Sequence, residues 1–181
     1  IIVTNCTVYG NPNTGIAYYS EPSLGRTDGT GIEFSYNDLY ANTSGIYPGR
    51  VDYVKIHHNK IHDGVRIGNY EPYGIGYEAG SYFEIYDNLI YNVYTNGIGI
   101  YGDFGTDGQS NYNKVYRNII YGTKYSTWAK DIAWQGQVGS NNSVFNNILY
   151  SADPQVWHFQ DDTTSSSGNA FYGNVLANGQ Y

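Results

Sequence analysis

Carboxylate, aromatic and amide side chains recur at one position after short stretches that contain an isoleucine. Three residues after the isoleucine of these stretches come Glu78, Tyr101 and Gln135. Aromatic faces stack on sugar rings, and carboxylates and amides hydrogen-bond to hydroxyl groups. Carboxylates can also act as general acid, general base or nucleophile. These residue types therefore suit a site for carbohydrate.

The wider set of candidates comes from the same stretches and from the segments beside them. Candidates for catalysis are Glu78, Asp103, Asp131 and Lys130. Candidates for substrate contact are Arg66, Tyr101, Trp134, Gln135, Trp157 and His158. Two carboxylates a few ångströms apart raise the pKa of one of them, which prepares a general acid.

A glycine-rich segment at 103–108 offers two carboxylates close together in sequence. Asp103 and Asp107 supply hard oxygen ligands of the kind that Ca²⁺ prefers. The segment lacks the full ligand spacing of a known calcium loop. The alternative is an ordinary turn, because Asp and Gly dominate turns.

A second cluster of ionisable residues contains three histidines. Its members are His57, His58, His62, Asp63 and Arg66. Period-two alternation predicts that His57 points outward and that His58 lies at a bend. A zinc site is conceivable, but no ligand from a second repeat is obvious. The alternatives are a surface histidine patch and contact with a substrate.

An asparagine followed two residues later by Leu, Ile or Val recurs along the chain and indicates the elements that position these residues. The asparagines are Asn37, Asn59, Asn88, Asn118, Asn147 and Asn174, separated by 22, 29, 30, 29 and 27 residues. Cys6 takes the asparagine's place in an earlier copy. Self-similarity at such a period is typical of solenoids.

Each copy contains short runs of alternating apolar and polar residues, which predict strands. The positions three before and two after the asparagine are apolar in all seven copies. A second strand follows in six copies, usually opened by glycine. The pattern predicts an all-β fold, a right-handed parallel β-helix of about seven rungs, that forms one domain over residues 1–181. The asparagine should hydrogen-bond to the rung below.

The outward positions should form ladders of like residues along the stack. Glu33, Lys55, Glu84 and Lys114 predict a solvent-exposed charge ladder. Two stripes account for much of the 22 tyrosines. Stacked aromatic residues stabilise a sheet surface, and the alternative is a platform for sugars. Cys6, at an inward position, is expected to be buried and inert.

Composition limits the partners and the setting. The net charge of −7 argues against nucleic acid and anionic membranes, and no run is long enough for membrane insertion as a helix. The polar, tyrosine-rich composition favours a secreted or cell-surface protein. The chain contains no methionine and opens at Ile1 inside a strand. We therefore expect a fragment or processed part of a longer protein with flanking domains.

The rung at 83–91, followed by Gly97-Ile98-Gly99-Ile100, resembles the repeats of the pectate-lyase-like superfamily of right-handed parallel β-helices. The resemblance covers essentially the whole chain. That superfamily includes polysaccharide lyases, glycoside hydrolases, alginate epimerases, phage tailspikes and disaggregatase-type surface proteins. It implies a polysaccharide partner that lies along one face of the helix. The chain lacks Asn-Thr-Asp, Gly-His-Gly, Arg-Ile-Lys and Asp-Pro-His strings, so no catalytic residue carries over by motif.

Two hypotheses follow for function. The first is an extracellular glycoside hydrolase or polysaccharide lyase. As a hydrolase, it would use Asp103 with Glu78 or Asp131 as acid and base. As a lyase, it would use Ca²⁺ held by Asp103 and Asp107, with Lys130 or Arg66 as base. The acidic net charge favours hydrolysis, because an anionic substrate would need a cation. The second hypothesis is a non-catalytic surface module for carbohydrate binding, adhesion or structure.

Overall fold

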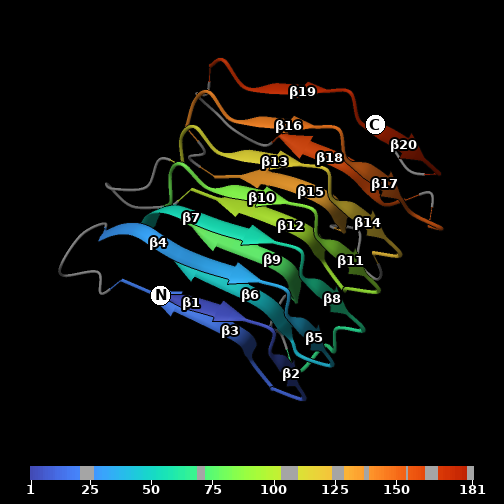
Figure 1. Ribbon diagram of the computed structural model, residues 1–181. Coiled ribbons are helices and arrows are strands. Elements are labelled where there is room, and N and C mark those ends of the chain that lie inside the picture. The colour runs from blue at the N-terminus through green and yellow to red at the C-terminus, as the bar shows by residue number, and fades with distance from the viewer. Residues whose placement is uncertain are drawn as a thin grey trace.

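The computed structural model is a parallel β-helix, as the asparagine period predicts. It describes residues 1–20, 27–68, 72–102, 110–123, 129–136, 139–153, 155–161 and 167–178. Short strands run around a common axis and stack rung upon rung from the N-terminal to the C-terminal end (Figure 1). All described strands belong to three parallel sheets. No helix in the described part of the chain is long and apolar enough to span a membrane.

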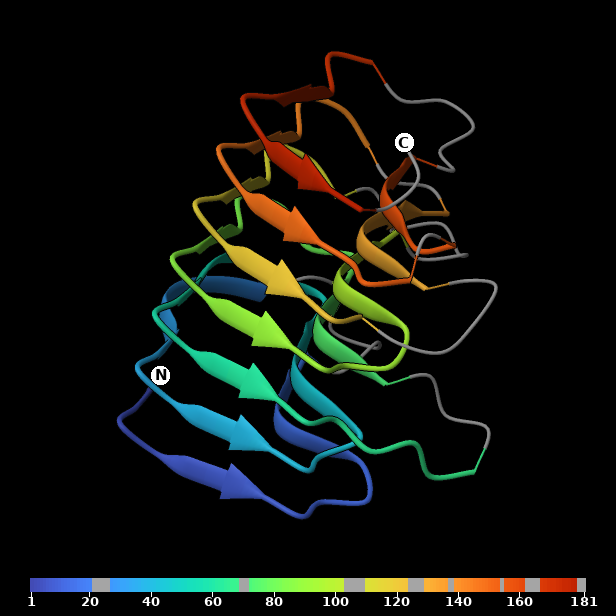
Figure 2. The same ribbon diagram turned by 90° about the vertical axis from the view of Figure 1, so that its right-hand side faces the viewer.

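Each sheet takes one strand from each successive rung, as the stacked arrows in Figure 2 show. Sheet A contains β1 (Ile2–Thr4), β4 (Thr27–Ser35), β7 (Val51–His57), β10 (Glu84–Tyr86), β13 (Lys114–Tyr116), β16 (Ser143–Phe145) and β19 (Ala170–Tyr172). Sheet B contains β2 (Thr7–Tyr9), β5 (Asp38–Tyr40), β8 (Lys60–His62), β11 (Leu89–Tyr91), β14 (Ile119–Tyr121), β17 (Ile148–Tyr150) and β20 (Val175–Ala177). Sheet C contains β3 (Thr14–Tyr19), β6 (Ser44–Gly49), β9 (Tyr73–Glu78), β12 (Asn96–Tyr101), β15 (Lys130–Gln135) and β18 (Trp157–Asp161).

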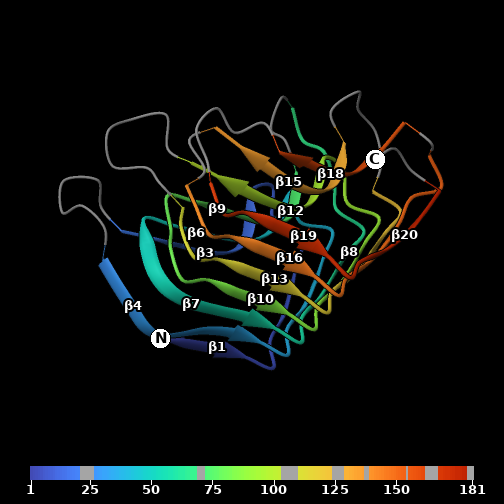
Figure 3. The ribbon, with the colours of Figure 1, turned by 90° about the horizontal axis from the view of Figure 1, so that it is seen from above.

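The three sheets enclose one apolar interior (Figure 3). On a typical rung it receives Ile85 from sheet A, Ile90 from sheet B and Ile98 from sheet C, all fully buried. Full burial of one such side chain contributes about 1.5–3 kcal/mol. The same positions on neighbouring rungs carry the same residue types, so like stacks on like throughout the core.

The repeated asparagine joins consecutive rungs at the bend between sheets A and B. The backbone N–H of Asn59 donates to Asn88 Oδ1 at 3.0 Å. The Nδ2 group of Asn88 in turn donates to the carbonyl of Ile56 at 2.9 Å. Equivalent bonds link the other ladder asparagines, which are buried except for the half-buried Asn174. The prediction that the asparagine satisfies the backbone of the rung below is therefore confirmed.

A second asparagine ladder lies at the bend that leads into sheet A. Asn113 N–H donates to Asn142 Oδ1 at 2.9 Å, and Asn142 N–H donates to Asn169 Oδ1 at 2.9 Å. Each of these residues comes five positions before an asparagine of the first ladder. Sequence reasoning missed this ladder, although the Asn-x₄-Asn spacing was there to find it.

The outward ladders also form as predicted. Glu84 lies in register with Lys55 and with Lys114, and Lys114 Nζ is 3.7 Å from Glu84 Oε1. The rings of Tyr86 and Tyr116 stack with centroids 5.1 Å apart. Cys6, in contrast, is exposed rather than buried. It lies between β1 and β2, on the first rung of the structure.

A row of glycines opens the strands of sheet C and allows it to approach sheet B closely. A Cβ atom on Gly74 would lie 2.5 Å from the carbonyl oxygen of Gly97 and 2.6 Å from Cγ2 of Ile90. A Cβ atom on Gly97 would similarly lie 2.5 Å from Cγ2 of Ile120. These rungs therefore need glycine at this position. Asp131 and His158 continue the row on the next two rungs.

Candidate functional site

The outer face of sheet C carries a row of tyrosine rings drawn from four successive rungs. The rings belong to Tyr19, Tyr47, Tyr73 and Tyr101. Their centroids are separated in turn by 6.4, 6.3 and 5.2 Å. We call these four residues the sheet C tyrosine row. Tyr19 is 46% exposed and the other three are half-buried, so the row is accessible from outside the helix.

Glycines in the strands beneath allow these rings to lie close to the backbone. A Cβ atom on Gly49 would lie 2.3 Å from Cε2 of Tyr19, and one on Gly76 would lie 2.8 Å from Cδ2 of Tyr47. A Cβ atom on Gly99 would meet the hydroxyl of Tyr101 at 2.3 Å. The rings cover bare backbone, so an aromatic surface takes the place of alternating side chains.

Glu78 lies among these rings and accepts hydrogen bonds from two of them. The hydroxyl of Tyr19 donates to Glu78 Oε2 across Gly49, which is in register with both residues. Tyr47 hydrogen-bonds to the same carboxylate. Burial and the nearby carboxylate raise the pKa of Tyr47 to about 12 and also raise that of Tyr19. Both phenols therefore stay protonated and act as donors at neutral pH.

Tyr101 and Gln135 extend this face toward the C-terminal end. Tyr101 is in register with Glu78 on one side and Gln135 on the other. Asn96 Nδ2 donates to the Tyr101 hydroxyl at 2.7 Å, and burial raises the pKa of that phenol. The expectation that Glu78, Tyr101 and Gln135 occupy neighbouring positions on one face is therefore confirmed.

Four other candidates do not lie on this face. Lys130, Asp131, Trp134 and His158 have at most 1% of their surface exposed. The expectation that they line an open substrate face is wrong, because neighbouring residues bury all four side chains. Trp134 shares the inward register of Ile100 and packs edge-on against Phe159 in the core, while Asp131 lies opposite Gly97.

Asp131 instead anchors a buried polar network. Its Oδ2 atom is 2.6 Å from His158 Nδ1, and its Oδ1 atom accepts a 2.5 Å hydrogen bond from Thr123 Oγ1. Burial raises the pKa of Asp131, and the two hydrogen bonds oppose that shift. The residue in line with Ile120 on the next rung is Leu149, which lacks a β-branched methyl group. Without that methyl group there is more room for the Cβ atom of Asp131, at a position where earlier rungs need glycine.

The register of β18 also differs from the one that the sequence predicts. Alignment on Val156 would pair Phe159 with Gln135, whereas the structure pairs Phe159 with Ile132 and Asp161 with Trp134. Val156 lies before the strand, which begins at Trp157. The apolar residue that starts the strand pattern is therefore Phe159.

The remaining candidates are exposed or lie outside the described residues. Trp157 is 38% exposed at the start of β18, and Arg66 is exposed in the connection between β8 and β9. Asp103 and Asp107, the expected calcium ligands, lie outside the described part of the chain.

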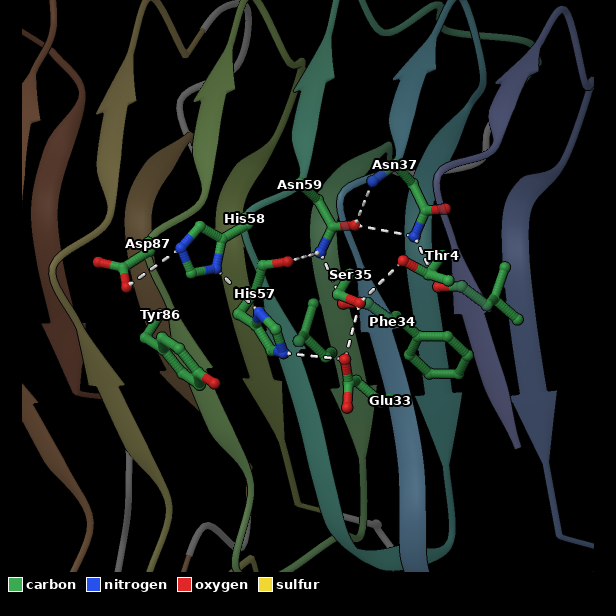
Figure 4. Close-up of polar contacts among 12 residues, drawn as sticks. Thr4, Glu33, Phe34, Ser35, Asn37, His57, His58, Asn59, Tyr86 and Asp87 are labelled. Atoms are coloured by element: carbon green, nitrogen blue, oxygen red, sulfur yellow. Dashed lines mark hydrogen bonds and ion pairs between the residues drawn. The ribbon is translucent and has the colours of Figure 1, made fainter.

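Histidines 57 and 58 form a polar cluster at the bend between sheets A and B (Figure 4). His57 Nδ1 lies 2.9 Å from His58 Nδ1, and His57 Nε2 lies 3.2 Å from Glu33 Oε1. Burial lowers the pKa of His57, against the influence of Glu33. His57 is buried at an outward-facing position, because its ring stacks on Tyr86 at 4.7 Å. His62 is separate, between Asp38 and Asp63.

A groove beside sheet A is a surface that sequence reasoning missed. It has a volume of about 430 Å³. Its lining consists of Tyr53, Lys55, Tyr82, Glu84, Tyr112 and Lys114. Its three tyrosines stack on one another with centroids 4.6 and 5.2 Å apart. The signal was a tyrosine six residues before the asparagine in three consecutive copies. Because their faces cover one another, these rings present edges rather than faces.

Comparison with known proteins agrees with this architecture. A family model described as a right-handed β-helix region matches residues 1–176. The chain belongs to the right-handed β-helix family. Among solved structures, this family member is similar to a double mutant of the periplasmic alginate epimerase AlgG, with a TM-score of 0.57 and 19% identity. The match covers 97% of this chain and 45% of the AlgG chain. A search of curated protein sequences finds no match.

Proposed function

We propose that this β-helix binds a polysaccharide along the outer face of sheet C. The observation that carries the proposal is the sheet C tyrosine row, with the carboxylate of Glu78 held among its rings. Because the row crosses four rungs, the glycan chain would run along the helix axis. Each sugar could then contact residues from a different rung.

The residue types divide the work of recognition between apolar and polar contacts. The tyrosine rings supply flat surfaces for the C–H faces of sugars. Glu78, the phenol hydroxyls and the amide of Gln135 supply acceptors and donors for sugar hydroxyls. Because the glycines below carry no side chains, the rings can pack directly against the sheet. The rings are then ordered before a ligand binds, so little conformational entropy is lost on binding.

The comparison with the alginate epimerase is consistent with a polysaccharide partner, since that protein's name denotes action on alginate. At 19% identity, however, the likeness concerns the fold. A secreted or cell-surface location belongs to the same proposal, because that is where such polymers are found. The chemistry of the face, rather than the likeness, supports the proposal.

Catalysis at Glu78 is the second candidate function. It is favoured by the hydrogen bonds that Tyr19 and Tyr47 donate to its carboxylate, since a positioned carboxylate beside phenols can exchange protons with a bound sugar. Glycoside hydrolysis commonly uses two carboxylates. Glu78 is the carboxylate that the described residues place among these rings. A hydrolase or lyase with Asp103, and with Ca²⁺ at Asp103 and Asp107, stays part of this second candidate.

The test is a panel of neutral and acidic polysaccharides, assayed for binding and for release of reducing ends or unsaturated products, with and without a chelator. We expect retention by at least one polymer. Absence of binding to every polymer would contradict the proposal.

The variant Glu78→Gln separates the two candidates. If Glu78 is catalytic, product release should fall by at least 100-fold while binding changes little. Binding without any product, in both the wild type and the variant, would leave a non-catalytic binding module. If the chelator stops product release and Glu78→Gln does not, the result would favour the calcium site.

A further inference from the structure

Two adjacent histidines direct the same ring nitrogen toward one point on the surface of the β-helix. His57 Nδ1 and His58 Nδ1 are 2.9 Å apart, and the planes of the two rings meet at 84° (Figure 4). At this distance only one proton can lie between the two nitrogens. When that proton is displaced, the Nδ1 atom of each imidazole therefore has a lone pair that can bind a ligand.

The outer nitrogen of each histidine faces a carboxylate that is itself held in place. Glu33 Oε1 lies 3.2 Å from His57 Nε2 and accepts a 2.8 Å hydrogen bond from Ser35 Oγ. Asp87 Oδ2 lies 3.8 Å from His58 Nε2, and Arg117 donates hydrogen bonds of 2.8 and 2.6 Å to Asp87. Metal-ligating histidines almost always donate their second N–H to such a partner, which fixes the ring and its tautomer.

The fold explains how two neighbouring residues converge in this way. His57 is the last residue of β7 and faces outward. His58 adopts a left-handed conformation with φ 53°, which brings its side chain beside that of His57. Tyr36 stacks on His58 at 4.8 Å and Tyr86 on His57 at 4.7 Å. The bend of the rung and the aromatic ladder thus orient both rings before any ligand arrives.

We propose that His57 and His58 form a chelate for one divalent transition-metal ion, with Cu²⁺ as the preferred ion. Two nitrogens 2.9 Å apart, each about 2.0 Å from an ion, subtend about 90° at that ion. That angle fits the square-planar geometry of Cu²⁺ better than the tetrahedral geometry of Zn²⁺. On binding, the ion displaces the proton that lies between the two Nδ1 atoms, and each neutral ring then carries its proton on Nε2, which faces Glu33 in His57 and Asp87 in His58.

Water completes the coordination of the ion in this proposal. Within the described residues, no three His, Cys, Asp or Glu side chains form a group able to hold a metal. The site is therefore open and exchangeable. The side chain of His58 is 40% exposed, which leaves a route from solvent. The carboxylates of Glu33 and Asp87 and the net charge of −7 attract a cation to this surface.

The test is a titration of tag-free protein with Cu²⁺ against a competing chelator, followed by electron paramagnetic resonance. We expect one ion per chain, with hyperfine structure from two imidazole nitrogens. His58→Gln, at a partly exposed position that should not perturb folding, is expected to weaken binding at least tenfold. Glu33→Gln is expected to weaken it about tenfold, as is typical for loss of an outer carboxylate.

His62→Gln is the matched control. His62 also lies in an aromatic ladder, stacked on Tyr91 at 4.8 Å, but its ring nitrogens contact Asp38 and Asp63 rather than another histidine. Its replacement should leave Cu²⁺ affinity unchanged. Binding that survives both His57→Gln and His58→Gln would overturn the proposal, as would a spectrum without two imidazole nitrogens. Glycan binding at sheet C is independent of either result.

Discussion

Glu78 takes its chemical setting from residues that are distant in sequence. Tyr19 precedes it by 59 residues, yet the stacking of rungs and the missing side chain of Gly49 bring the phenol to its carboxylate. The two donors have protons that resist removal, because burial and the negative charge of Glu78 both disfavour phenolate. At the residue scale, this cluster is a hydrogen-bonding surface rather than an ionised one.

A tyrosine titration checks this cluster. The raised pKa of Tyr47, about 12, predicts that its phenol stays protonated at pH 11, where ordinary tyrosines have ionised. The ultraviolet absorbance of Tyr47→Phe and of the wild type should therefore rise equally up to that pH. In Glu78→Gln, Tyr47 should ionise at lower pH, because one of the causes of the shift is gone. A Tyr47 that titrates near pH 10 in the wild type would contradict the geometry.

Asp131 predicts a pH dependence of stability. Its pKa is raised in the folded state, so its contribution to stability is fully present below its unfolded pKa of about 3.9 and is lost as pH rises through the folded value. Asp131→Asn removes this dependence. Unfolding in denaturant from pH 3 to pH 7 should show the stability of the wild type, relative to the variant, falling as pH rises. A relative stability that rises over this interval would show that the hydrogen bonds outweigh burial.

The bends of the helix, rather than its strands, contain most of the buried polar groups. Asn88 receives the N–H of Asn59 and donates to the carbonyl of Ile56, so one side chain satisfies backbone groups on adjacent rungs. The asparagine spacing made this element predictable, because a stack of one rung per repeat places all six asparagines in line.

Replacement of one ladder asparagine should be costly. Asn88→Ala removes the acceptor of the Asn59 N–H, and a buried N–H left unpaired costs about 1–3 kcal/mol. It also removes the hydrogen bond from Asn88 Nδ2 to the carbonyl of Ile56. We expect a loss of about 3 kcal/mol in the free energy of unfolding, measured in urea. Asn13→Ala, at an exposed position, is the control and should change stability by less than about 0.5 kcal/mol. Equal effects of the two changes would refute the role of the ladder.

The glycine row at the start of sheet C makes a separate prediction. Gly74→Ala places a Cβ atom 2.5 Å from a backbone oxygen, so adjacent rungs must move apart. The variant should lose more than about 2 kcal/mol of stability. Gly64→Ala, where the nearest atoms are 3.6 Å away, is the control and should be tolerated. Similar melting temperatures for the two variants would show that the sheets are less closely packed than described.

For the whole molecule, the sequence predicts most of the architecture but only part of the candidate site. Periodicity identifies which residues share a rung position. Counting three residues from the isoleucine of each repeat therefore predicts that Glu78, Tyr101 and Gln135 are neighbours. It fails where the repeat itself changes. Asp131 occupies a glycine position, and the strand at 157–161 is displaced relative to Val156, so residues expected outside lie in the core.

Contacts between rings also exceeded what periodicity could reveal. The sheet C tyrosines do not share one alignment column. Tyr47 and Tyr73 come from different positions of their strands, and they meet because glycines let the rings lie along the sheet. The prediction of stacked aromatic columns was therefore right for sheets A and B. In sheet C the rings that meet come from different strand positions, so the sequence period could not reveal their contacts.

The central claim is that the sheet C tyrosine row is a binding face for polysaccharide. The most direct test compares the affinity of Tyr73→Ala with that of Tyr91→Ala, for the polymer that the wild type binds best. Both residues are half-buried tyrosines in aromatic ladders, but Tyr91 lies on sheet B between His62 and Tyr121. We predict that Tyr73→Ala weakens binding at least tenfold, about 1.4 kcal/mol, and that Tyr91→Ala leaves it unchanged. Equal affinities of the two variants, with both folded, would contradict the proposed face.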